Sequence, residues 1–206
     1  MSLSNKILFA TSNPHKIDEV AAILAPEGWE VVGLDTVDKQ IDEPVEDQPT
    51  FEGNASLKAM YYARHTGEIC LADDSGLEVD ALDGQPGVHS ARFAGVTGPR
   101  ERVDAANNDK LVARLKHVEE SRRTGRFVCA MALSDGERTL AHTRGEVAGK
   151  LLLEPRGENG FGYDPYFFVP ELGCTTAELS QEGKNQISHR GRATRQLLEI
   201  IKKLNR

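Results

Sequence analysis

Two adjacent carboxylates, Asp73 and Asp74, follow a short apolar run at 69–72 and precede Ser75 and Gly76. Two like charges about 4 Å apart repel by roughly 1 to 4 kcal/mol at effective dielectric constants of about 80 to 20, so the pair needs a cation, hydrogen-bond donors or a chemical use. Mg²⁺ is the natural cation, because one or two carboxylates commonly hold it together with substrate phosphates. The alternative is structural, an acid at a strand end that caps a turn at Ser75 and Gly76, and these residues alone do not decide between the two.

The segment TSNPHK, residues 11–16, has residue types that suit phosphate binding. It follows a β-like run and opens a helical pattern. The hydroxyls of Thr11 and Ser12, exposed backbone N–H groups and the Lys16 ammonium could therefore converge on an anion at a helix N-terminus. The alternative is an ordinary helix cap by Ser12 or Asn13, with Lys16 in solvent.

A third set of charged residues lies in and before a helical pattern at 51–67. Lys58 lies within that pattern and, by itself, is typical of a solvated lysine. The loop at 38–50 carries the acids Asp42, Glu43, Glu46 and Asp47. Such a charge run usually forms an exposed loop face. Only proximity to the other charged groups would give these residues a role in chemistry.

Aromatic and donor side chains gather in the last quarter of the chain. The loop GFGYDPYF at 160–167 could let a flat ring stack on Phe161 while Asp164 accepts a hydrogen bond from the edge of that ring. The alternative is a loop whose aromatic side chains line the core. Donors near the start of the last helix are Lys184, His189 and Arg190. Solvation of a helix start is the alternative for them.

Two glycine-containing segments do not match the known nucleotide-binding loops. The segment at 145–151 has its glycines one residue too close for a P-loop and carries Leu151 in place of the required Ser or Thr. A strand of a hairpin is the better interpretation. The segment at 157–164 lacks the GxGxxG order of a dinucleotide-binding loop.

Length and composition indicate an ordinary globular protein. The chain has 206 residues, of which 39% are hydrophobic and 28% charged, and we expect a single domain over 1–206 with two lobes. The formal net charge of -7 argues against a broad basic surface for nucleic-acid polymers. Cys70, Cys129 and Cys174 are scattered and odd in number, which favours a reducing, cytoplasmic location over a disulfide framework. No apolar run approaches the ~20 residues that cross a bilayer, so no membrane partner is expected.

The spacing of apolar and turn-forming residues predicts the elements that must position these groups. Strands are expected at 6–11, 29–34, 68–74, 76–82, 126–134, 138–152 and 166–170. Helices are expected around 17–24, at 51–67 ended by Gly67, at 101–123 ended by Gly125, and at 187–204. The apolar stripe of the last helix is formed by Leu197, Leu198, Ile201 and Leu204. The sum predicts an α/β fold of mixed α+β character with a mixed sheet.

Six segments, in chain order, resemble the inosine triphosphate pyrophosphatase family. They are TSNPHK (11–16), TFEGNASLKA (50–59), LADDSGLEVDAL (71–82), PGVHSARFAG (86–95), GFGYDPYF (160–167) and ISHRG (187–191). The resemblance implies an elongated, twisted mixed sheet flanked by helices, two lobes around a central cleft, and usually a homodimer. It also implies Mg²⁺-dependent hydrolysis of ITP, dITP and XTP to the monophosphate and pyrophosphate, which cleans the nucleotide pool.

The resemblance implies a role for each matching residue. Asp74 would be the general base and a metal ligand, and Glu46 the second metal ligand. The substrate-binding residues in the first half would be Thr11, Ser12, Asn13, Pro14, His15, Lys16, Lys58 and Ser75, with the phosphates held by the N-terminal residues and Lys58. Those at the base and sugar would be Phe161, Gly162, Tyr163, Asp164, Lys184, His189 and Arg190. The part of Asp73 is left open.

Two positions depart from the family pattern. Gly53 stands where the family commonly has Glu, and Gln48 stands where the family has Gly soon after the loop acid. Glu43 and Asp47 therefore stay alternatives to Glu46 as the second metal ligand.

Base selection follows from donor and acceptor patterns. A 6-oxo purine presents an acceptor to which His189 and Arg190 can donate, whereas adenine presents an amino donor and leaves them without a partner. Guanine shares the 6-oxo group, so a constraint near purine C2 must reject GTP. Two other functions stay open, a pyrophosphatase for modified pyrimidine nucleotides and a nucleotide sensor without hydrolysis. The carboxylates of Asp73 and Asp74 argue against the sensor, since a phosphate binder gains nothing from carboxylates without a metal.

Overall fold

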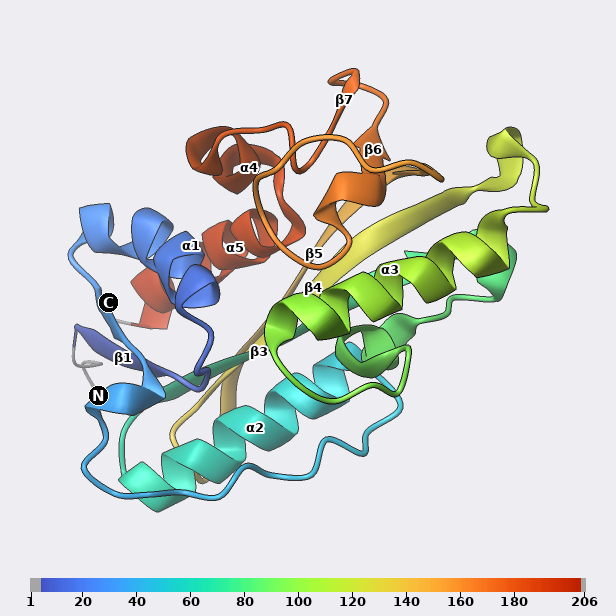
Figure 1. Ribbon diagram of the computed structural model, residues 1–206. Coiled ribbons are helices and arrows are strands. Elements are labelled where there is room, and N and C mark those ends of the chain that lie inside the picture. The colour runs from blue at the N-terminus through green and yellow to red at the C-terminus, as the bar shows by residue number, and fades with distance from the viewer. Residues whose placement is uncertain (1–4, 205–206) are drawn as a thin grey trace. The chain divides into compact units, whose positions relative to one another are not determined.

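The computed structural model describes residues 5–204, and its strands form one mixed sheet (Figure 1). The strands are β1 (Lys6–Phe9), β2 (Glu30–Val32), β3 (Cys70–Val79), β4 (Thr124–Ser134), β5 (Thr139–Leu151), β6 (Phe167–Val169) and β7 (Cys174–Thr175). Their order in the sheet is β2-β1-β3-β4-β5-β6-β7. β1 pairs in parallel with β2 and β3, whereas β6 pairs antiparallel with β5 and β7. The predicted mixed α/β class is confirmed.

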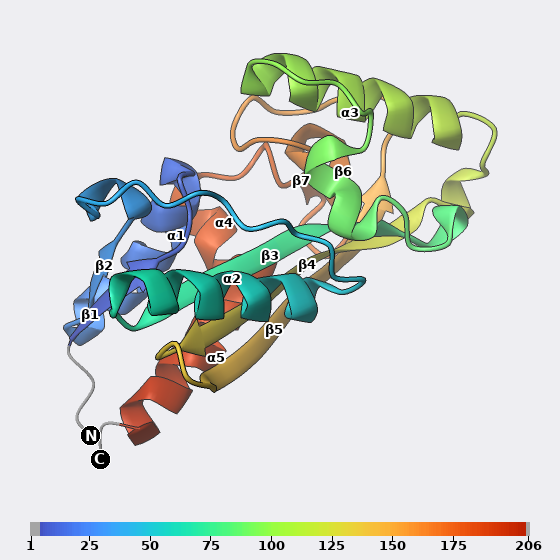
Figure 2. The same cartoon turned by 90° about the horizontal axis from the view of Figure 1, so that it is seen from below.

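The α-helices of the described chain accompany this sheet. They are α1 (Pro14–Leu24), α2 (Phe51–Thr66), α3 (Arg100–Leu115), α4 (Gln181–Ile187) and α5 (His189–Leu204). Figure 2 shows α2 running along β3. Thr50 caps the start of α2 by accepting from the Gly53 N–H at 3.1 Å, and Gly67 ends it in the left-handed region at φ 73°. The boundaries predicted for this helix are confirmed.

The chain divides into two compact units. Unit 1 contains the described residues up to Asp74, Cys129–Gly145, and the residues from His189 onward. Unit 2 contains Ser75–Val128 and Glu146–Ser188. The strands β3, β4 and β5 each contribute residues to both units. The expectation of one domain with two lobes around a cleft stays a prediction.

Unit 1 has an apolar core between the sheet and the helices α1 and α5. The core includes Phe9, Leu24, Leu71, Met131, Leu197, Leu198 and Ile201. Full burial of such a side chain stabilises the fold by about 1.5–3 kcal/mol, so this cluster fixes both helices on the strands that carry the charged residues. Of the predicted apolar stripe of α5, Leu197, Leu198 and Ile201 are buried, whereas Leu204 is 40% exposed. The buried part of the stripe therefore ends at Ile201.

Unit 2 has a second apolar core beneath α3. It includes Leu77, Val79, Leu111, Leu115, Phe127, Val147, Leu151 and Phe167. The segment at 145–151 lies within β5, as the hairpin interpretation predicted, and not in a phosphate loop. β5 follows β4 through a short turn in which the Asp135 N–H donates to the Arg138 carbonyl at 3.3 Å. β4 and β5 are neighbours in the sheet, so the interpretation of 145–151 as a strand of a hairpin is confirmed.

The expected break between two strands at Ser75 and Gly76 is wrong, because β3 continues through both residues. A β-carbon at position 76 would lie 2.3 Å from Ser90 Oγ and 2.7 Å from the Gly87 carbonyl oxygen. Gly76 therefore marks a close approach of another segment to the strand, and not a turn. Asp73 and Asp74 consequently lie inside a strand, and the structural alternative of an acid that caps a turn does not apply.

The helix predicted at 101–123 ends early, at Leu115, and Gly125 is not its cap. Gly125 lies in β4, where a β-carbon would be 2.5 Å from the Glu78 carbonyl oxygen. Close packing of neighbouring backbones again explains the glycine. The C-terminal helical segment also differs from prediction, because Ser188 separates α4 from α5.

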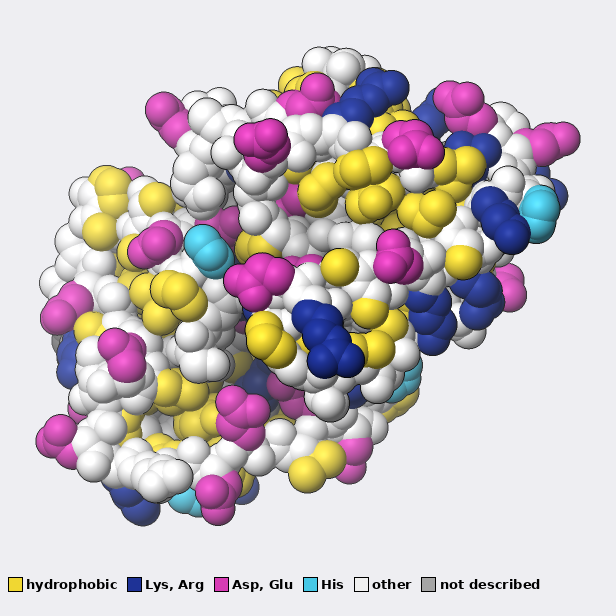
Figure 3. Space-filling view, in the orientation of Figure 1, with side chains coloured by type: hydrophobic (Ala, Val, Ile, Leu, Met, Phe, Trp, Pro, Cys, Tyr) yellow, Lys and Arg dark blue, Asp and Glu magenta, His cyan; other side chains and the backbone are white. Residues whose placement is uncertain are grey.

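Among residues 5–204, no helix combines the length and the apolar character needed to cross a membrane. Figure 3 shows Asp and Glu side chains spread over one face of the molecule, with small groups of Lys and Arg among them. An anionic ligand on such a surface depends on local cations, as the net charge of -7 also indicates.

The three cysteines should differ sharply in reactivity. Cys70 and Cys129 are buried, whereas Cys174 is half-buried. Burial raises the pKa of Cys70 to about 12, and burial together with Asp73 raises that of Cys129. At pH 8, about one Cys70 thiol in 10⁴ would then be ionised. We expect iodoacetamide to label Cys174 alone in the folded protein and all three cysteines in guanidinium chloride, as measured by peptide mass spectrometry. Equal labelling without denaturant would contradict the burial of Cys70 and Cys129.

Candidate active site

Asp73 and Asp74 make their contacts with different helices, because successive side chains of a strand point to opposite faces. Asp73 contacts side chains of α1 and α5. Asp74 contacts side chains of α2. Each acid therefore has its own hydrogen-bond donors and cations. These offset the repulsion between the two like charges that are adjacent in the sequence.

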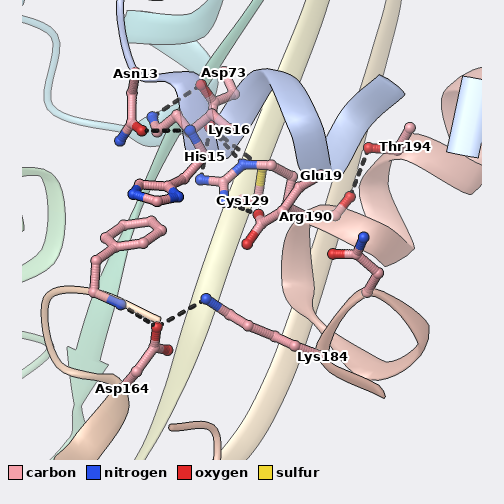
Figure 4. Close-up of polar contacts among 12 residues, drawn as sticks. Asn13, His15, Lys16, Glu19, Asp73, Cys129, Asp164, Lys184, Arg190 and Thr194 are labelled. Atoms are coloured by element: carbon pink, nitrogen blue, oxygen red, sulfur yellow. Dashed lines mark hydrogen bonds and ion pairs between the residues drawn. The ribbon is translucent and has the colours of Figure 1, made fainter. Parts of the chain in front are cut away.

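Asp73 lies in a buried ion-pair network (Figure 4). Its Oδ1 accepts from Lys16 Nζ at 2.9 Å, and its Oδ2 accepts from Arg190 Nη2 at 3.1 Å and Nε at 3.2 Å. The same guanidinium also pairs with Glu19 of α1. Arg190 is 1% exposed and Asp73 2%. The network therefore fixes the direction of the Lys16 side chain, because the Asp73 carboxylate binds its ammonium.

The charge on Asp73 is stabilised by its partners. Burial alone would raise the pKa of this carboxyl, but Lys16, Arg190 and Lys58 together hold the pKa well below its usual range. Asp73 is thus a permanent anion at neutral pH, suited to hold a lysine in place. It is a poor proton acceptor, because a carboxyl with a low pKa does not retain a proton near neutral pH.

Asp74 has a different environment. Its Oδ2 accepts from Asn54 Nδ2 at 2.9 Å, and its Oδ1 lies 4.0 Å from Lys58 Nζ. Lys58 also pairs with Glu46 Oε2 at 3.1 Å. Asn54 is fully buried, and its own Oδ1 accepts from the Gln48 N–H at 3.0 Å. The amide of Asn54 is therefore oriented by a backbone group, and it orients Asp74 in turn.

The pKa of Asp74 is raised, in contrast with that of Asp73. Burial is the main cause, and the negative charges of Glu46 and Asp73 add to it, whereas Lys58 and the Asn54 hydrogen bond oppose it. A carboxylate whose pKa is moved towards neutrality is a better proton acceptor at physiological pH. Of the two adjacent acids, Asp74 therefore has the electrostatics of a general base.

A pocket of about 150 Å³ in unit 1 brings several of the predicted residues together. Its lining includes Thr11, Ser12, Lys16, Glu46 and Lys58, with Asp73 at its wall. Small-molecule sites usually start at about 300 Å³, so this pocket has the size for the phosphate end of a nucleotide and not for a whole one. Asn13, Pro14, His15 and Asp74 are not part of the lining.

The start of α1 is capped locally. Asn13 Oδ1 accepts from the His15 N–H at 3.0 Å, and Thr11 Oγ1 accepts from the Asn13 N–H at 3.1 Å. The alternative of an ordinary cap is thus confirmed for Asn13. It does not exclude phosphate binding nearby, because Lys16 extends to the buried Asp73 and lines the pocket.

The loop acids differ in their distance from this pocket. Glu46 contacts Lys58, and Glu43 lines the pocket as well. Asp47 is exposed and accepts from the Gln48 side chain at 2.7 Å, outside the lining. The geometry therefore favours Glu46 or Glu43 over Asp47 as the second metal ligand, which stays a prediction.

The two positions that depart from the family pattern contact each other. A β-carbon at Gly53 would lie 2.8 Å from the Gln48 β-carbon. The absence of a side chain at 53 therefore makes room for the one at 48. The pair leaves the hydrogen bond from the Gln48 backbone to Asn54 in place, so the departures do not disturb the contacts of Asp74.

Unit 2 holds five of the predicted base and sugar residues, namely Phe161, Gly162, Tyr163, Asp164 and Lys184, whereas His189 and Arg190 belong to unit 1. Asp164 contacts both Phe161 and Lys184. Its Oδ2 accepts from the Phe161 N–H at 2.8 Å and from Lys184 Nζ at 2.8 Å (Figure 4). The Lys184 ammonium also lies 4.8 Å from the centre of the Phe161 ring, within range of a cation–π contact. Lys184 is only 4% exposed, so it is a buried partner of Asp164 and not a solvated lysine.

The remaining predicted residues take structural positions. The buried Tyr163 donates its hydroxyl to the Ser90 carbonyl at 2.8 Å, and burial raises its pKa. Ser75 follows Asp74 on β3 and is half-buried. His189 begins α5. Its carbonyl oxygen packs so closely against Gly145 that a β-carbon at position 145 would lie 2.1 Å from that oxygen. Their roles toward a substrate stay predictions.

Asn54, Glu19 and Tyr62 were missed as site residues by sequence reasoning. Asn54 and Lys58 are four residues apart on α2, a spacing that places both on one face and could have been noticed. Glu19 interrupts the apolar stripe of α1 three residues after Lys16, a signal of a buried charge with a partner. Tyr62 lines the pocket, and burial raises its pKa to about 12, so it offers a neutral hydroxyl there.

Known proteins resemble this chain over nearly its whole length. It matches the Ham1 family over residues 7–200. A dITP/XTP pyrophosphatase of Desulforamulus reducens is 47% identical over 199 residues, covering 97% of this chain and 96% of that protein. A dITP/XTP pyrophosphatase of Thermus thermophilus is 47% identical over 197 residues, covering 96% of this chain and 92% of that protein.

Solved structures agree with these sequence matches. A HAM1 protein from Coxiella burnetii has a TM-score of 0.85 at 36% identity, covering 96% of this chain and 98% of that chain. A nucleoside-triphosphatase or dITP/XTP pyrophosphatase from Mycobacterium abscessus has a TM-score of 0.75 at 44% identity, covering 94% of this chain and 98% of that chain. The chain therefore belongs to the Ham1 family.

Proposed function

We propose that this chain hydrolyses non-standard purine nucleoside triphosphates, namely ITP, dITP and XTP, to the monophosphate and pyrophosphate. The relatives that carry the name dITP/XTP pyrophosphatase support this activity. The observation that carries it is the pair of cations Lys16 and Lys58 around one pocket, beside an acid with a raised pKa, Asp74. Lysines without such an acid would suit a phosphate-binding sensor, whereas hydrolysis needs a proton acceptor.

The proposed reaction is attack of water on the α-phosphorus. Lys16 and Lys58 bind phosphate oxygens and offset the negative charge that increases there as the reaction proceeds. Asp74 accepts the proton of the attacking water, which forms the new O–P bond. The bond between the α-phosphorus and its bridging oxygen breaks, and pyrophosphate leaves with that electron pair. Asp73 holds Lys16, and Asn54 holds Asp74, so that neither has to be reoriented during the reaction.

Mg²⁺ fits the carboxylates of this region. Glu46 and Asp74 both contact Lys58, and they are hard oxygen donors of the number that Mg²⁺ commonly takes from a protein that also binds phosphates. No larger group of potential ligands occurs in the described part of the chain, which suits an ion that is shared with its substrate. When bound by Glu46 and Asp74, Mg²⁺ would supply a positive charge to the phosphate oxygens.

The base end of the substrate belongs to other residues in this proposal. Phe161 would stack on the purine, and Asp164 would accept from its edge, with Lys184 keeping that carboxylate in place. Arg190 would donate to the 6-oxo group together with His189, although its guanidinium already contacts Asp73 and Glu19. The proposal includes a cytoplasmic homodimer, as the resemblance implies.

Pyrophosphate release from ITP with and without Mg²⁺ tests the function. We expect rapid release at millimolar Mg²⁺ and loss of activity with excess EDTA, restored by adding Mg²⁺ back. GTP, ATP and dUTP serve as competing substrates, and ITP and XTP should be cleaved in clear preference to all three. Binding of ITP without release would indicate a sensor, and preference for dUTP would indicate a pyrimidine enzyme; either result would refute the proposal.

A further inference from the structure

The backbone of the loop at 160–164 is hydrogen-bonded to side chains of α3 at Gly162, and the Phe161 ring lies 5.6 Å from the Arg100 guanidinium of the same helix. The Gly162 N–H donates to Asp104 Oδ2 at 3.0 Å, and the Gly162 carbonyl accepts from Asn108 Nδ2 at 2.9 Å. Asp104 and Asn108 are four residues apart, so they lie on one face of the helix. Both polar backbone groups of Gly162 are thus bound by side chains of α3.

This attachment matters because the loop has no sheet or helix of its own at 160–162. Gly160 has φ 79° and Gly162 has φ 62°, a left-handed conformation that glycine adopts without strain but does not enforce. Backbone groups in such a segment need partners from side chains. The order of the loop therefore depends on the residues that bind it.

The side chains of Asp104 and Asn108 are themselves oriented by their contacts. Asp104 pairs with Arg100 at 3.0 Å, one turn earlier on the helix. Asn108 is 9% exposed, and its Oδ1 has no hydrogen-bond partner among the described residues. The bond to Gly162 is therefore what orients the Asn108 amide, because a flipped amide would place Oδ1 against the Gly162 carbonyl oxygen.

We propose that Asp104 and Asn108 are positioning residues that determine base selectivity. They fix the peptide of Gly162, which is bonded directly to Phe161, and thereby fix the direction of the ring on which the purine would stack. Asp164 is also bound by Lys184 and Thr176, so the carboxylate that would contact the edge of the base keeps partners that neither α3 side chain supplies. This inference rests on the proposed function, since it concerns the base of that substrate.

The test measures kinetics of Asp104→Ala and Asn108→Ala with ITP and ATP. The phosphate-binding and proton-accepting residues are untouched by either change. We therefore expect the KM for ITP to rise about tenfold in each variant, kcat to stay within about threefold, and the ratio of kcat/KM for ITP over ATP to fall. The double variant should lose little more than either single one, because both act through Gly162.

Two neighbouring residues provide matched controls. Asn107 is also a buried asparagine of α3, but it bonds to the Ala94 N–H and to the Ser90 and Ala91 carbonyls and not to the loop. Asn107→Ala should lower the thermal midpoint without changing the ratio of kcat/KM for ITP over that for ATP. Asp109 is exposed on the same helix, so Asp109→Ala should change neither quantity.

Conservative variants keep the proposal testable if an alanine variant does not fold. Asp104→Asn retains an acceptor for the Gly162 N–H and should restore the KM for ITP. Asn108→Asp retains the shape but replaces the donor by a second acceptor, and should lose selectivity as Asn108→Ala does. The proposal is overturned if the ITP to ATP ratio of Asp104→Ala and Asn108→Ala equals that of the controls. Absence of ITP hydrolysis in the unmodified protein would instead refute the proposed function.

Discussion

Replacement of Asp74 by asparagine should abolish pyrophosphate release from ITP while the protein stays folded. An amide cannot accept the proton of the attacking water, and loss of a general base lowers the rate by about 10²- to 10⁴-fold. Loss of a metal ligand would add to this decrease. The fold should be preserved because the buried Asp74 carboxylate, whose pKa is raised, is an electrostatic cost that the neutral side chain relieves.

The measurement combines kcat with a thermal midpoint. We expect the midpoint of Asp74→Asn to equal or exceed that of the unmodified protein. Asp18→Asn is a matched control, because Asp18 is an exposed acid on α1, and its activity should be unchanged. Near-normal turnover in Asp74→Asn would remove Asp74 from the mechanism and leave Glu46 as the carboxylate to test next.

Replacement of Arg190 by methionine should destabilise the protein severely. Methionine approximates the length of the side chain but leaves Glu19 and Asp73 without the cation that pairs with both. Breaking a buried ion pair by removing one partner costs about 3–5 kcal/mol. For a chain of this size, that loss corresponds to a decrease of about 6 to 20 °C in the thermal midpoint. Arg195→Met, at an exposed position of the same helix, should have little effect.

The loss of folding stability in Arg190→Met should also depend on pH. In the unmodified protein the pKa of Asp73 is lowered, so its contribution to stability is present above the ordinary pKa and is lost only as the pH falls through the lowered one. In Arg190→Met, the pKa of Asp73 rises towards its ordinary value, because Lys16 remains but the buried guanidinium is gone. The variant therefore loses part of the stability that the charged carboxylate contributes above the ordinary pKa. Denaturant titrations should show a larger loss at pH 7 than at pH 4, and a loss below about 1 kcal/mol at pH 7 would contradict the buried network.

The fold was largely predictable because apolar spacing and helix caps are local signals. Gly67 follows a helical pattern and ends α2 as predicted, in a left-handed conformation. Gly76 and Gly125 looked equivalent in the sequence but lie inside strands, where they make room for Ser90 and for the backbone of Glu78. A glycine needed for close approach cannot be distinguished from a turn glycine without knowledge of which segment lies beside it. That information belongs to the tertiary structure.

The candidate site was predictable to a similar extent. Lys16 and Lys58 could be named from their motifs, and the pocket brings them together. The different partners of Asp73 and Asp74 follow from strand alternation, but only once β3 is known to continue through both. The pairing of Asp73 with Arg190 spans 117 positions, and no local pattern predicts a contact of that separation.

The contact between Gln48 and Gly53 constrains the order in which these two positions can change during evolution. A side chain gained at 53 while Gln48 is present would meet its β-carbon at 2.8 Å, and the backbone of the segment that orients Asn54 would have to move. Loss of the side chain at 48 first removes that collision and leaves the Thr50 hydroxyl oxygen as the near neighbour, 3.1 Å from the new β-carbon. Of the two single-substitution routes between this pair and a pair with glycine at 48 and a side chain at 53, the one through glycine at both positions is therefore the less strained, in whichever direction it is taken.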